Sequence, residues 1–252
     1  MVKEGLPELL RKELSARKWK PQVIAMSGVT DCYQPIERKL KLTRRCLEVL
    51  AEFRNPVCII TKNFLVTRDV DLYRGLAEHD AALVNISITT LDEKLTPKLE
   101  PRAALPKHRL AAVKILSDAG VPVNVLIAPV IPGLTDHEMP AIIRAAREAG
   151  AKSVGYTALR LPFGVGSLFE EWLASNFPDR KEKVLNRIRA MRGGKLNDPN
   201  FGSRMRGEGI FAEQMNQIFH VARRKAGFEE IPRPTLSAAG FRIPPGPQLS
   251  LF

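Results

Sequence analysis

The sequence predicts an α/β fold with a mainly parallel sheet that forms a complete or partial barrel. Short runs rich in β-branched residues recur at roughly thirty-residue intervals through the first 160 residues, as expected of buried strands. Segments with a helical period lie between these runs, and this alternation implies parallel pairing. Neither G-x-G-x-x-G after the first run nor G-x-x-x-x-G-K-S/T anywhere is present. The commonest phosphate-binding signatures of open sheets are therefore missing, which favours a barrel.

Five short apolar runs are the predicted strands. Each has a length typical of a buried strand and is too short for an ordinary helix. We expect their carboxyl ends to meet at one edge of the sheet, where functional side chains of such folds collect. The runs are Val23–Val29, Val57–Thr61, Leu83–Thr89, Val123–Ala128 and Ser153–Thr157.

Helices are predicted between the strands. The segment Ile36–Leu50 follows Pro35, which suits a first helical position, and its apolar residues fall on one face. Leu110–Leu116 repeats this spacing and ends at Gly120. A helix with a weaker pattern is expected over Arg68–Glu78.

One helix has start and stop signals of its own. Thr135 and Glu138 have the spacing of a capping box, in which each side chain bonds a backbone N–H of the other residue. Met139 to Ala146 supply an apolar face, and Gly150 follows the end. The sequence therefore predicts a helix that begins at this box.

The pattern changes after about Arg160. Further helices are expected over Leu168–Asn176, Lys181–Met191 and Ile210–Lys225, with a turn-rich stretch before the last of them. The proline-rich end, Ile231–Phe252, is either an ordered strap or a mobile tail. We predict a barrel over residues 1–160, a helical extension over 161–230 and this tail over 231–252.

Composition indicates a globular protein with an anionic partner. The 252 residues are 44% hydrophobic, and no apolar run has the length of a membrane span or a signal peptide, so we expect a cytoplasmic protein. The formal net charge of +12 favours nucleic acid, a phosphorylated substrate or an acidic partner, although a solvated basic surface is an equal alternative. Cys32, Cys46 and Cys58 lie far apart and are expected to be reduced thiols.

Polar residues follow each predicted strand. Asp31 could cap the next helix or bind an amine. Lys62 follows an apolar strand, which makes a functional role as probable as a structural one. Of Ser87 and Thr89, we expect one to face the barrel mouth and the other the helices. The four histidines show no H-E-x-x-H spacing, and G-x-S-x-G is absent, so zinc and serine-hydrolase hypotheses are weak.

Several long phrases together resemble a known family. They are TDCYQPIERKLKLTRRCLEVL, NPVCIITKNFLVTRDVDL, ISITTLDEKLTPKLEPRAALPKHRLAAVKILSDAGVPVNVLIAPVIPGLTDHE and LNDPNFGSRMRGEG. The sequence resembles radical S-adenosylmethionine (SAM) proteins related to spore photoproduct lyase, from about Leu6 to the final QLSLF. This resemblance implies a partial (β/α)6 barrel of TIM-barrel type. It also implies a 4Fe-4S cluster, held by a C-x-x-x-C-x-x-C loop, that cleaves SAM to a 5'-deoxyadenosyl radical.

The sequence departs from the family pattern at the cluster loop. The likeness begins in a helix around Leu6–Leu14, which in the family follows the cluster, and the C-x-x-x-C-x-x-C loop is absent from this chain. We therefore expect a truncated barrel without its first strand, with Val23–Val29 at an open edge. We expect no metal ligands here and no catalysis by this chain alone. A truncated gene model is the favoured explanation, and a degenerate gene or a separate cluster-bearing segment are the alternatives.

The resemblance also implies a set of SAM-binding positions. Thr30 and Asp31 match the place where the family meets the methionyl amine, and Lys62 and Ser87 lie near its carboxylate or ribose. The stretch from Ala128 to Ile131 matches the segment beside adenine. The predicted cofactor-binding residues are Thr30, Asp31, Lys62, Ser87, Thr89, Ala128, Val130 and Ile131.

Three functions remain open from the sequence. The first is radical chemistry on nucleic acid or another anionic molecule, by a longer protein or with a partner segment. The second is a non-catalytic protein that binds nucleic acid through its basic residues, for which binding should weaken steeply with salt. The third is a remnant with no function of its own.

Overall fold

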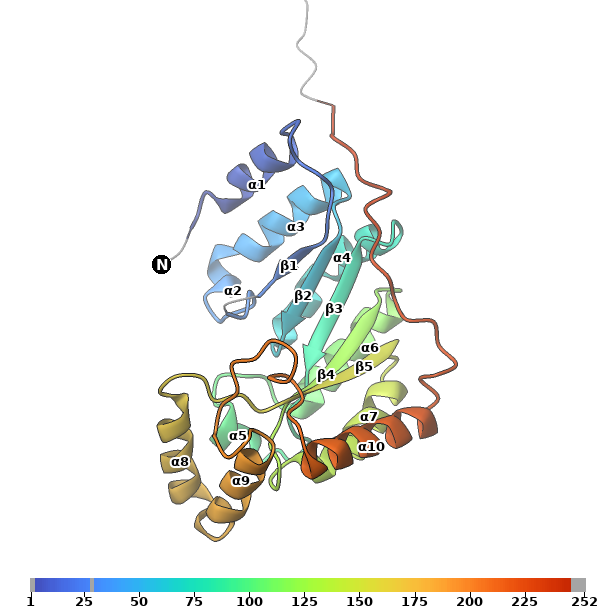
Figure 1. Ribbon diagram of the computed structural model, residues 1–252. Helices are drawn as coiled ribbons and strands as arrows, with labels where there is room; N and C mark the ends of the chain where they lie inside the picture. Colours follow the sequence, from blue (N-terminus) through green and yellow to red (C-terminus); the bar gives the residue numbers. More distant parts are fainter. Residues whose placement is uncertain (1–2, 28–29, 246–252) are drawn as a thin grey trace, which may run out of the picture.

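The computed structural model describes residues 3–27 and 30–245, and within them five parallel strands form one sheet. The strands follow their order in the sequence, β1-β2-β3-β4-β5 (Figure 1). All five predicted runs form strands, although β1 has only three residues and Gly28 and Val29 lie outside the described residues. The strands are β1 (Ile24–Met26), β2 (Val57–Thr61), β3 (Ala82–Ser87), β4 (Val123–Val130) and β5 (Ser153–Ala158).

All strand pairs are parallel, which places the carboxyl ends at one edge of the sheet, and the register is interrupted between Ile127 and Val130 of β4. Val57 of β2 lies opposite Ile24 and Ala82, and β4 pairs with β5 from Asn124 and Ser153 onward. Each connection joins neighbouring parallel strands, and because such crossovers are almost always right-handed, the connecting helices are expected to cover one face. The described sheet has β1 and β5 as its edges. This is an α/β fold with the form of a partial barrel, as predicted.

Helices connect each strand to the next and overlap the predicted segments, with bounds that differ from the predicted ones by several residues. α1 precedes the sheet, α2 and α3 lead to β2, and the 3-10 helix η1 with α4 leads to β3. The short α5 and the longer α6 lead to β4, and η2 with α7 leads to β5. Their bounds are α1 Leu6–Leu14, α2 Glu37–Leu40, α3 Leu42–Phe53, η1 Phe64–Asp69, α4 Val70–Ala77, α5 Thr96–Leu99, α6 Pro106–Asp118, η2 Asp136–Glu138 and α7 Met139–Glu148.

The first predicted helix is divided in two. Lys41 has a φ of 48°, in the left-handed region, and separates α2 from α3. The Glu37 carboxylate accepts bonds from the backbone N–H groups of Leu42 and Thr43, both at 3.0 Å. The side chain thereby satisfies free N–H groups at the start of α3, which stabilises the break.

The predicted capping box is wrong in its contacts, although a helix does begin there. The Thr135 hydroxyl accepts a bond from the Ile131 N–H at 2.9 Å and closes the turn after β4 instead. Glu138 accepts bonds from the Thr90 hydroxyl and the Leu91 N–H, at 2.6 and 2.7 Å. Both side chains thus join loops rather than the helix start. The predicted stop at Gly150 is confirmed, since its φ of 97° ends the segment after α7.

Three helices follow β5 and pack in two places. α8 and α9 enclose a small core of their own, which includes Phe169, Leu173 and Val184. The last helix packs on the main core through residues such as Met215 and Phe219. The bounds are α8 Val165–Asn176, α9 Pro178–Ala190 and α10 Ile210–Lys225.

The described part of the C-terminal segment lies as a strap. The Ser237 N–H donates to the Asp80 carbonyl at 2.9 Å, and the Arg242 N–H donates to the Phe53 carbonyl at 2.9 Å. The rings of Phe241 and Phe53 lie with centroids 6.1 Å apart. Residues 231–245 therefore cross the ends of α3 and α4, as Figure 1 shows along the red segment. The proline-rich segment was expected to be either an ordered strap or a mobile tail, and residues 231–245 form an ordered strap.

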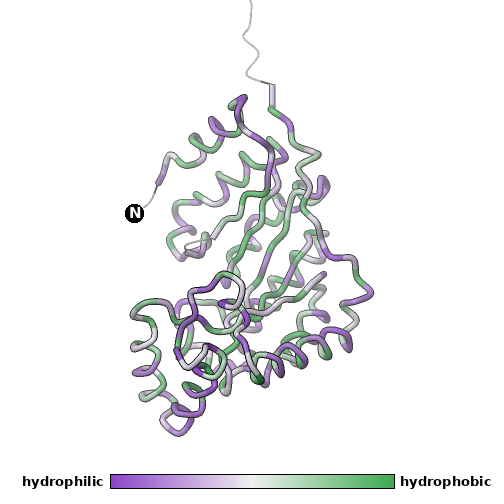
Figure 2. Tube along the Cα trace, viewed as in Figure 1, coloured by the Kyte–Doolittle hydropathy of each residue, from purple (hydrophilic) through white to green (hydrophobic). Residues whose placement is uncertain are grey.

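The main core lies on the sheet and beneath its helices. The core includes residues of β2, β3 and β4, and Ile59, Val84 and Val125 among them are fully buried. Figure 2 shows hydrophobic residues along these strands and hydrophilic stretches over the outer helix α9. In the described part of the chain, no helix is long and apolar enough to cross a membrane.

Candidate functional site

A cavity of about 600 Å³ lies where β1 and β2 end. Residues after β1, including Thr30 and Asp31, form one wall, and Lys62 and Asn63 after β2 form the next. The loop after α5, from Glu100 to Ala103, forms the remaining wall. We call this the strand-end cavity. It brings together three of the predicted site residues, Thr30, Asp31 and Lys62.

The Asp31 carboxylate joins the ends of the two strands. It accepts bonds from the Tyr33 N–H at 2.9 Å, the Thr61 hydroxyl at 2.8 Å and the Lys62 N–H at 2.9 Å. The helix-cap hypothesis is wrong, because α2 has no side-chain cap and these bonds lead to strand ends. A carboxylate offers about four acceptor positions, and three donors leave one for a ligand amine. Asp31 is half-buried on the cavity wall, where such a ligand can reach it.

Lys62 is held by a chain of ionic contacts. Its Nζ lies 3.3 Å from Glu100 Oε1, and that oxygen also accepts a bond from the Thr89 hydroxyl at 2.8 Å. The other oxygen, Glu100 Oε2, accepts a bond from Arg109 Nη2 at 2.6 Å. The Glu100 carboxylate therefore positions the Lys62 ammonium, and Arg109 in turn holds that carboxylate in place.

Arg109 fixes the loop that covers the cavity. Its side chain is 1% exposed and also donates to the carbonyls of Ala104 at 2.7 Å and Ser87 at 3.0 Å. The Ala104 N–H donates to the Lys62 carbonyl at 3.3 Å. Sequence reasoning missed both Glu100 and Arg109 as site residues. The sequence does contain a signal for Arg109, because its helical spacing places it on the same face as the buried Val113 and Leu116.

The remaining predicted residues do not line the strand-end cavity. Ser87 and Thr89 are both buried, and the expectation that one faces the barrel mouth and the other the helices stays a prediction. Here β3 ends at Ser87, and the Thr89 hydroxyl bonds Glu100 and the Ala128 carbonyl, the latter at 3.0 Å. Ala128 is half-buried. Val130 and Ile131 are fully buried in the main core and the small core, respectively.

The cysteines are poor candidates for iron ligands. Burial raises the pKa of the Cys32 thiol to about 12 and that of Cys46 to about 11, and it also raises the pKa of Cys58. These thiols are therefore protonated at neutral pH, whereas metal binding needs the thiolate. Among residues 3–27 and 30–245, no three His, Cys, Asp or Glu side chains could together hold a metal ion. The described residues do not fit a 4Fe-4S cluster.

A group of guanidinium side chains lies beyond β5. Arg192 donates to the carbonyls of Leu159 at 2.9 Å and Ser203 at 3.3 Å, and burial lowers its pKa, with a further contribution from the charge of Arg160. In the described chain, the buried Nε atoms of Arg160 and Arg204 have no hydrogen-bond partner. Unpaired buried donors of this kind suit an anionic ligand.

The comparisons with known proteins find curated relatives whose roles are not described. The chain is 29% identical over 209 residues to an uncharacterized protein of Mycobacterium tuberculosis, over 82% of this chain and 60% of the relative. It is 30% identical over 187 residues to an uncharacterized protein of Methanocaldococcus jannaschii, over 74% of this chain and 67% of the relative. The chain thus spans about 60% of the length of its mycobacterial relative.

Among solved structures, the fold is similar to spore photoproduct lyase. The complex of that lyase with dinucleoside spore photoproduct gives a TM-score of 0.59 at 12% identity, over 88% of this chain and 63% of that chain. A mutant of the lyase with bound AdoMet and the same dinucleoside gives a TM-score of 0.57 at 13% identity. At these identities the likeness shows a shared fold. Residues 2–146, more than half of the chain, match the radical SAM superfamily model. This chain belongs to the radical SAM superfamily.

Proposed function

We propose that this chain is the SAM-binding barrel of a radical SAM enzyme, and that its strand-end cavity holds the methionyl end of SAM. The observation that carries this proposal is that Asp31 lies on one wall of the cavity and Lys62 lies on the next wall. The amino acid end of SAM is a zwitterion, so its amine suits the carboxylate and its carboxylate suits the ammonium. A volume of about 600 Å³ also lies within the usual range for a small-molecule site.

The other predicted positions would serve the nucleoside end of SAM. Thr30 extends the wall beside Asp31. Ser87 ends β3, Thr89 lies two residues beyond it, and the Thr89 hydroxyl donates to the Ala128 carbonyl. We propose that these residues border the ribose. Val130 and Ile131, which are buried behind this edge, would support the adenine segment.

The residues of this chain would bind and orient SAM. Asp31 would accept the amine, and Lys62 would bind the carboxylate from a position set by Glu100. When bound, a 4Fe-4S cluster supplies the electron for reductive cleavage of SAM in this superfamily. The described residues do not fit that cluster, so a separate cluster-bearing segment and the inactivity of this chain alone stay predictions.

We propose that the substrate is anionic, with nucleic acid as the favoured class. The formal net charge of +12 and the unpaired Nε atoms of Arg160 and Arg204 support an anion near the end of β5. A fold neighbour, spore photoproduct lyase, has been solved with a dinucleoside spore photoproduct. A non-catalytic nucleic-acid-binding protein is the alternative, and it would bind nucleic acid without binding SAM.

Calorimetric titration with SAM tests the proposed site without requiring catalysis. Lys62→Ala and Asp31→Asn should each weaken SAM binding by roughly tenfold, a loss of about 1.4 kcal/mol. Lys152→Ala is the matched control, because this exposed lysine precedes β5 at the opposite end of the sheet. Equal affinity of the wild type and both site variants would show that SAM binds elsewhere. No detectable binding by the wild type would favour the non-catalytic alternative.

A further inference from the structure

Two adjoining cavities form a groove on the other side of α5. The first, of about 380 Å³, lies between α5, η2 and the start of α9, and the second, of about 570 Å³, continues along α9. His137 and Arg180 line both cavities, so the two are continuous. We call this the basic groove. Its cationic side chains are Lys94, Lys98, Arg180, Lys183 and Arg187, with His137 between them.

Four of these cations have no partner of opposite charge among residues 3–27 and 30–245. Lys94, Lys98, Arg180 and Lys183 are exposed, and none forms an ion pair within the part of the chain that the structure describes. Arg187 differs, because its Nη1 lies 3.0 Å from Asp136. The positive charge of the other four is therefore available to an external anion.

The carboxylates of the groove are already engaged in hydrogen bonds. Glu138 accepts bonds from Thr90 and Leu91, and Asp92 accepts a bond from the Lys94 N–H at 2.7 Å. Asp136 faces Arg187. The five cations of the groove outnumber its three carboxylates, Asp92, Asp136 and Glu138, so the groove carries a net positive charge.

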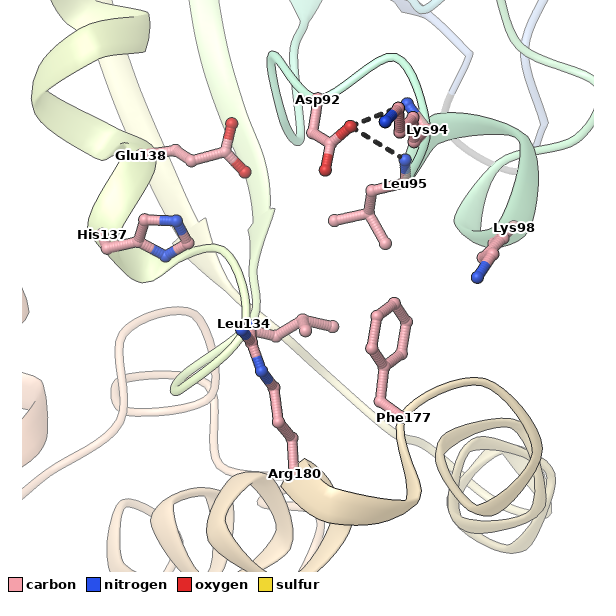
Figure 3. A pocket seen from close by; sticks show the side chains of 9 residues that line it. All are labelled: Asp92, Lys94, Leu95, Lys98, Leu134, His137, Glu138, Phe177 and Arg180. Atoms are coloured by element: carbon pink, nitrogen blue, oxygen red, sulfur yellow. Dashed lines mark hydrogen bonds between the residues drawn. The ribbon is translucent and has the colours of Figure 1, made fainter.

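An aromatic ring lies among these cations. Lys98 Nζ is 5.4 Å from the centroid of the Phe177 ring, and the Trp172 ring packs behind Phe177 at 5.5 Å. Figure 3 shows Phe177 between Lys98 and Leu134, with Arg180 below Leu134 and with His137 and Glu138 on the opposite side of the pocket from Lys98. Alternation of cations with a flat apolar face is typical of surfaces that bind single-stranded nucleic acid.

We propose that the basic groove binds the backbone of single-stranded nucleic acid, with phosphates at Lys94, Lys98, Arg180 and Lys183 and a base against Phe177. This inference rests on the proposed function, from which it takes the substrate class, and it adds where the strand binds. The groove and the strand-end cavity lie on either side of one short segment. Lys94 and Lys98 face the groove, and Glu100 to Ala103 line the cavity.

Binding of a fluorescein-labelled twelve-residue oligothymidylate, measured by anisotropy over a series of salt concentrations, tests the groove. Arg180→Ala and Lys183→Ala should each weaken binding by several-fold and reduce the salt slope by about 0.7. Lys181→Ala is the matched control, because this lysine lies on the same helix and lines neither cavity. Phe177→Leu should weaken binding and leave the salt slope unchanged, since it removes stacking and no charge. An equal loss from Lys181→Ala and Lys183→Ala would overturn the proposal.

Competition distinguishes a strand from a discrete phosphate ligand. Thymidine monophosphate and inorganic phosphate share the phosphate chemistry but span only one cation, so they should displace the oligonucleotide only at far higher concentration. Displacement by either at the concentration of the unlabelled oligonucleotide would overturn a strand site.

Oligonucleotide binding is measured without SAM or cluster, and Lys62→Ala should leave it unchanged. Failure of the wild-type chain to bind SAM, with oligonucleotide binding at the groove intact, would therefore refute only the proposed SAM site. The reverse result would refute only the groove.

Discussion

The strand-end cavity and the basic groove flank the same segment, yet their charged groups are held in opposite ways. In the cavity, Asp31, Lys62 and Glu100 already bond other parts of the protein, and the 1% exposed Arg109 holds Glu100 in place. In the groove, four exposed cations have no ion pair among the described residues. The difference indicates that the cavity is built to orient one small ligand. The groove relies on an external polyanion for charge balance.

The largest expected effect comes from the buried support of the cavity. Arg109→Ala should lower the free energy of unfolding by about 3–5 kcal/mol, because it leaves the Glu100 carboxylate without its buried partner. It also removes the donors to the Ser87 and Ala104 carbonyls. Urea unfolding followed by circular dichroism measures the change. A loss below about 1 kcal/mol would show that Glu100 does not depend on Arg109.

A smaller effect is expected from the link between β1 and β2. Asp31→Asn replaces an acceptor oxygen with an NH₂ group that faces backbone or hydroxyl donors, which should cost about 1–3 kcal/mol of unfolding free energy. Thr30→Ala is a suitable control, because Thr30 is exposed on the same cavity. Equal stability of the Asn variant and the control would mean that Asp31 is not structural.

A surface ion pair should contribute less and should depend on pH. Hydrogen bonding and charge from Arg44 hold the pKa of Asp71 below its ordinary value of 3.8. A lowered carboxyl pKa stabilises the fold above that value, and the gain is lost as the pH falls through the folded-state pKa. Because both side chains are partly exposed, Asp71→Asn should cost at most about 1 kcal/mol at pH 7, and this cost should shrink as the pH falls through the folded-state pKa. A pH-independent cost would assign the effect to packing.

The smallest effect on stability is expected in the groove. Arg180→Ala and Lys183→Ala should change the free energy of unfolding by no more than about 0.5 kcal/mol, because both side chains are exposed and have no ion pair among the described residues. The same urea unfolding experiment measures it. A cost near that of Asp31→Asn would show that the groove is structural, which would remove the contrast.

The sequence predicted the strands well because their signal is local. The five apolar runs fall on the five observed strands, and Gly150 ends its helix as expected. The failures are at contacts made by distant residues. Thr135 and Glu138 have capping-box spacing, but Glu138 bonds Thr90 and Leu91, forty-eight and forty-seven residues away. Spacing alone contains no information about such partners.

The candidate site was predicted in part for the same reason. Strand ends could be found from the sequence, so Thr30, Asp31 and Lys62 were placed near one another, and they do line one cavity. Glu100 follows the short helix α5, which has no periodic signal, and its contact with Lys62 depends on how the loop folds back. The basic groove joins side chains more than eighty residues apart, Lys94 and Arg180, which no local pattern connects.

Amide shift mapping by NMR tests most directly whether the two sites take different ligands. The ¹⁵N-labelled chain would be titrated separately with SAM and with the oligothymidylate. SAM should shift the amides of Asp31, Lys62 and Ala103 around the strand-end cavity, and the oligonucleotide should shift those of Lys94, Lys98 and Lys183. Shifts of one common set by both ligands, or of residues in neither set, would contradict the account.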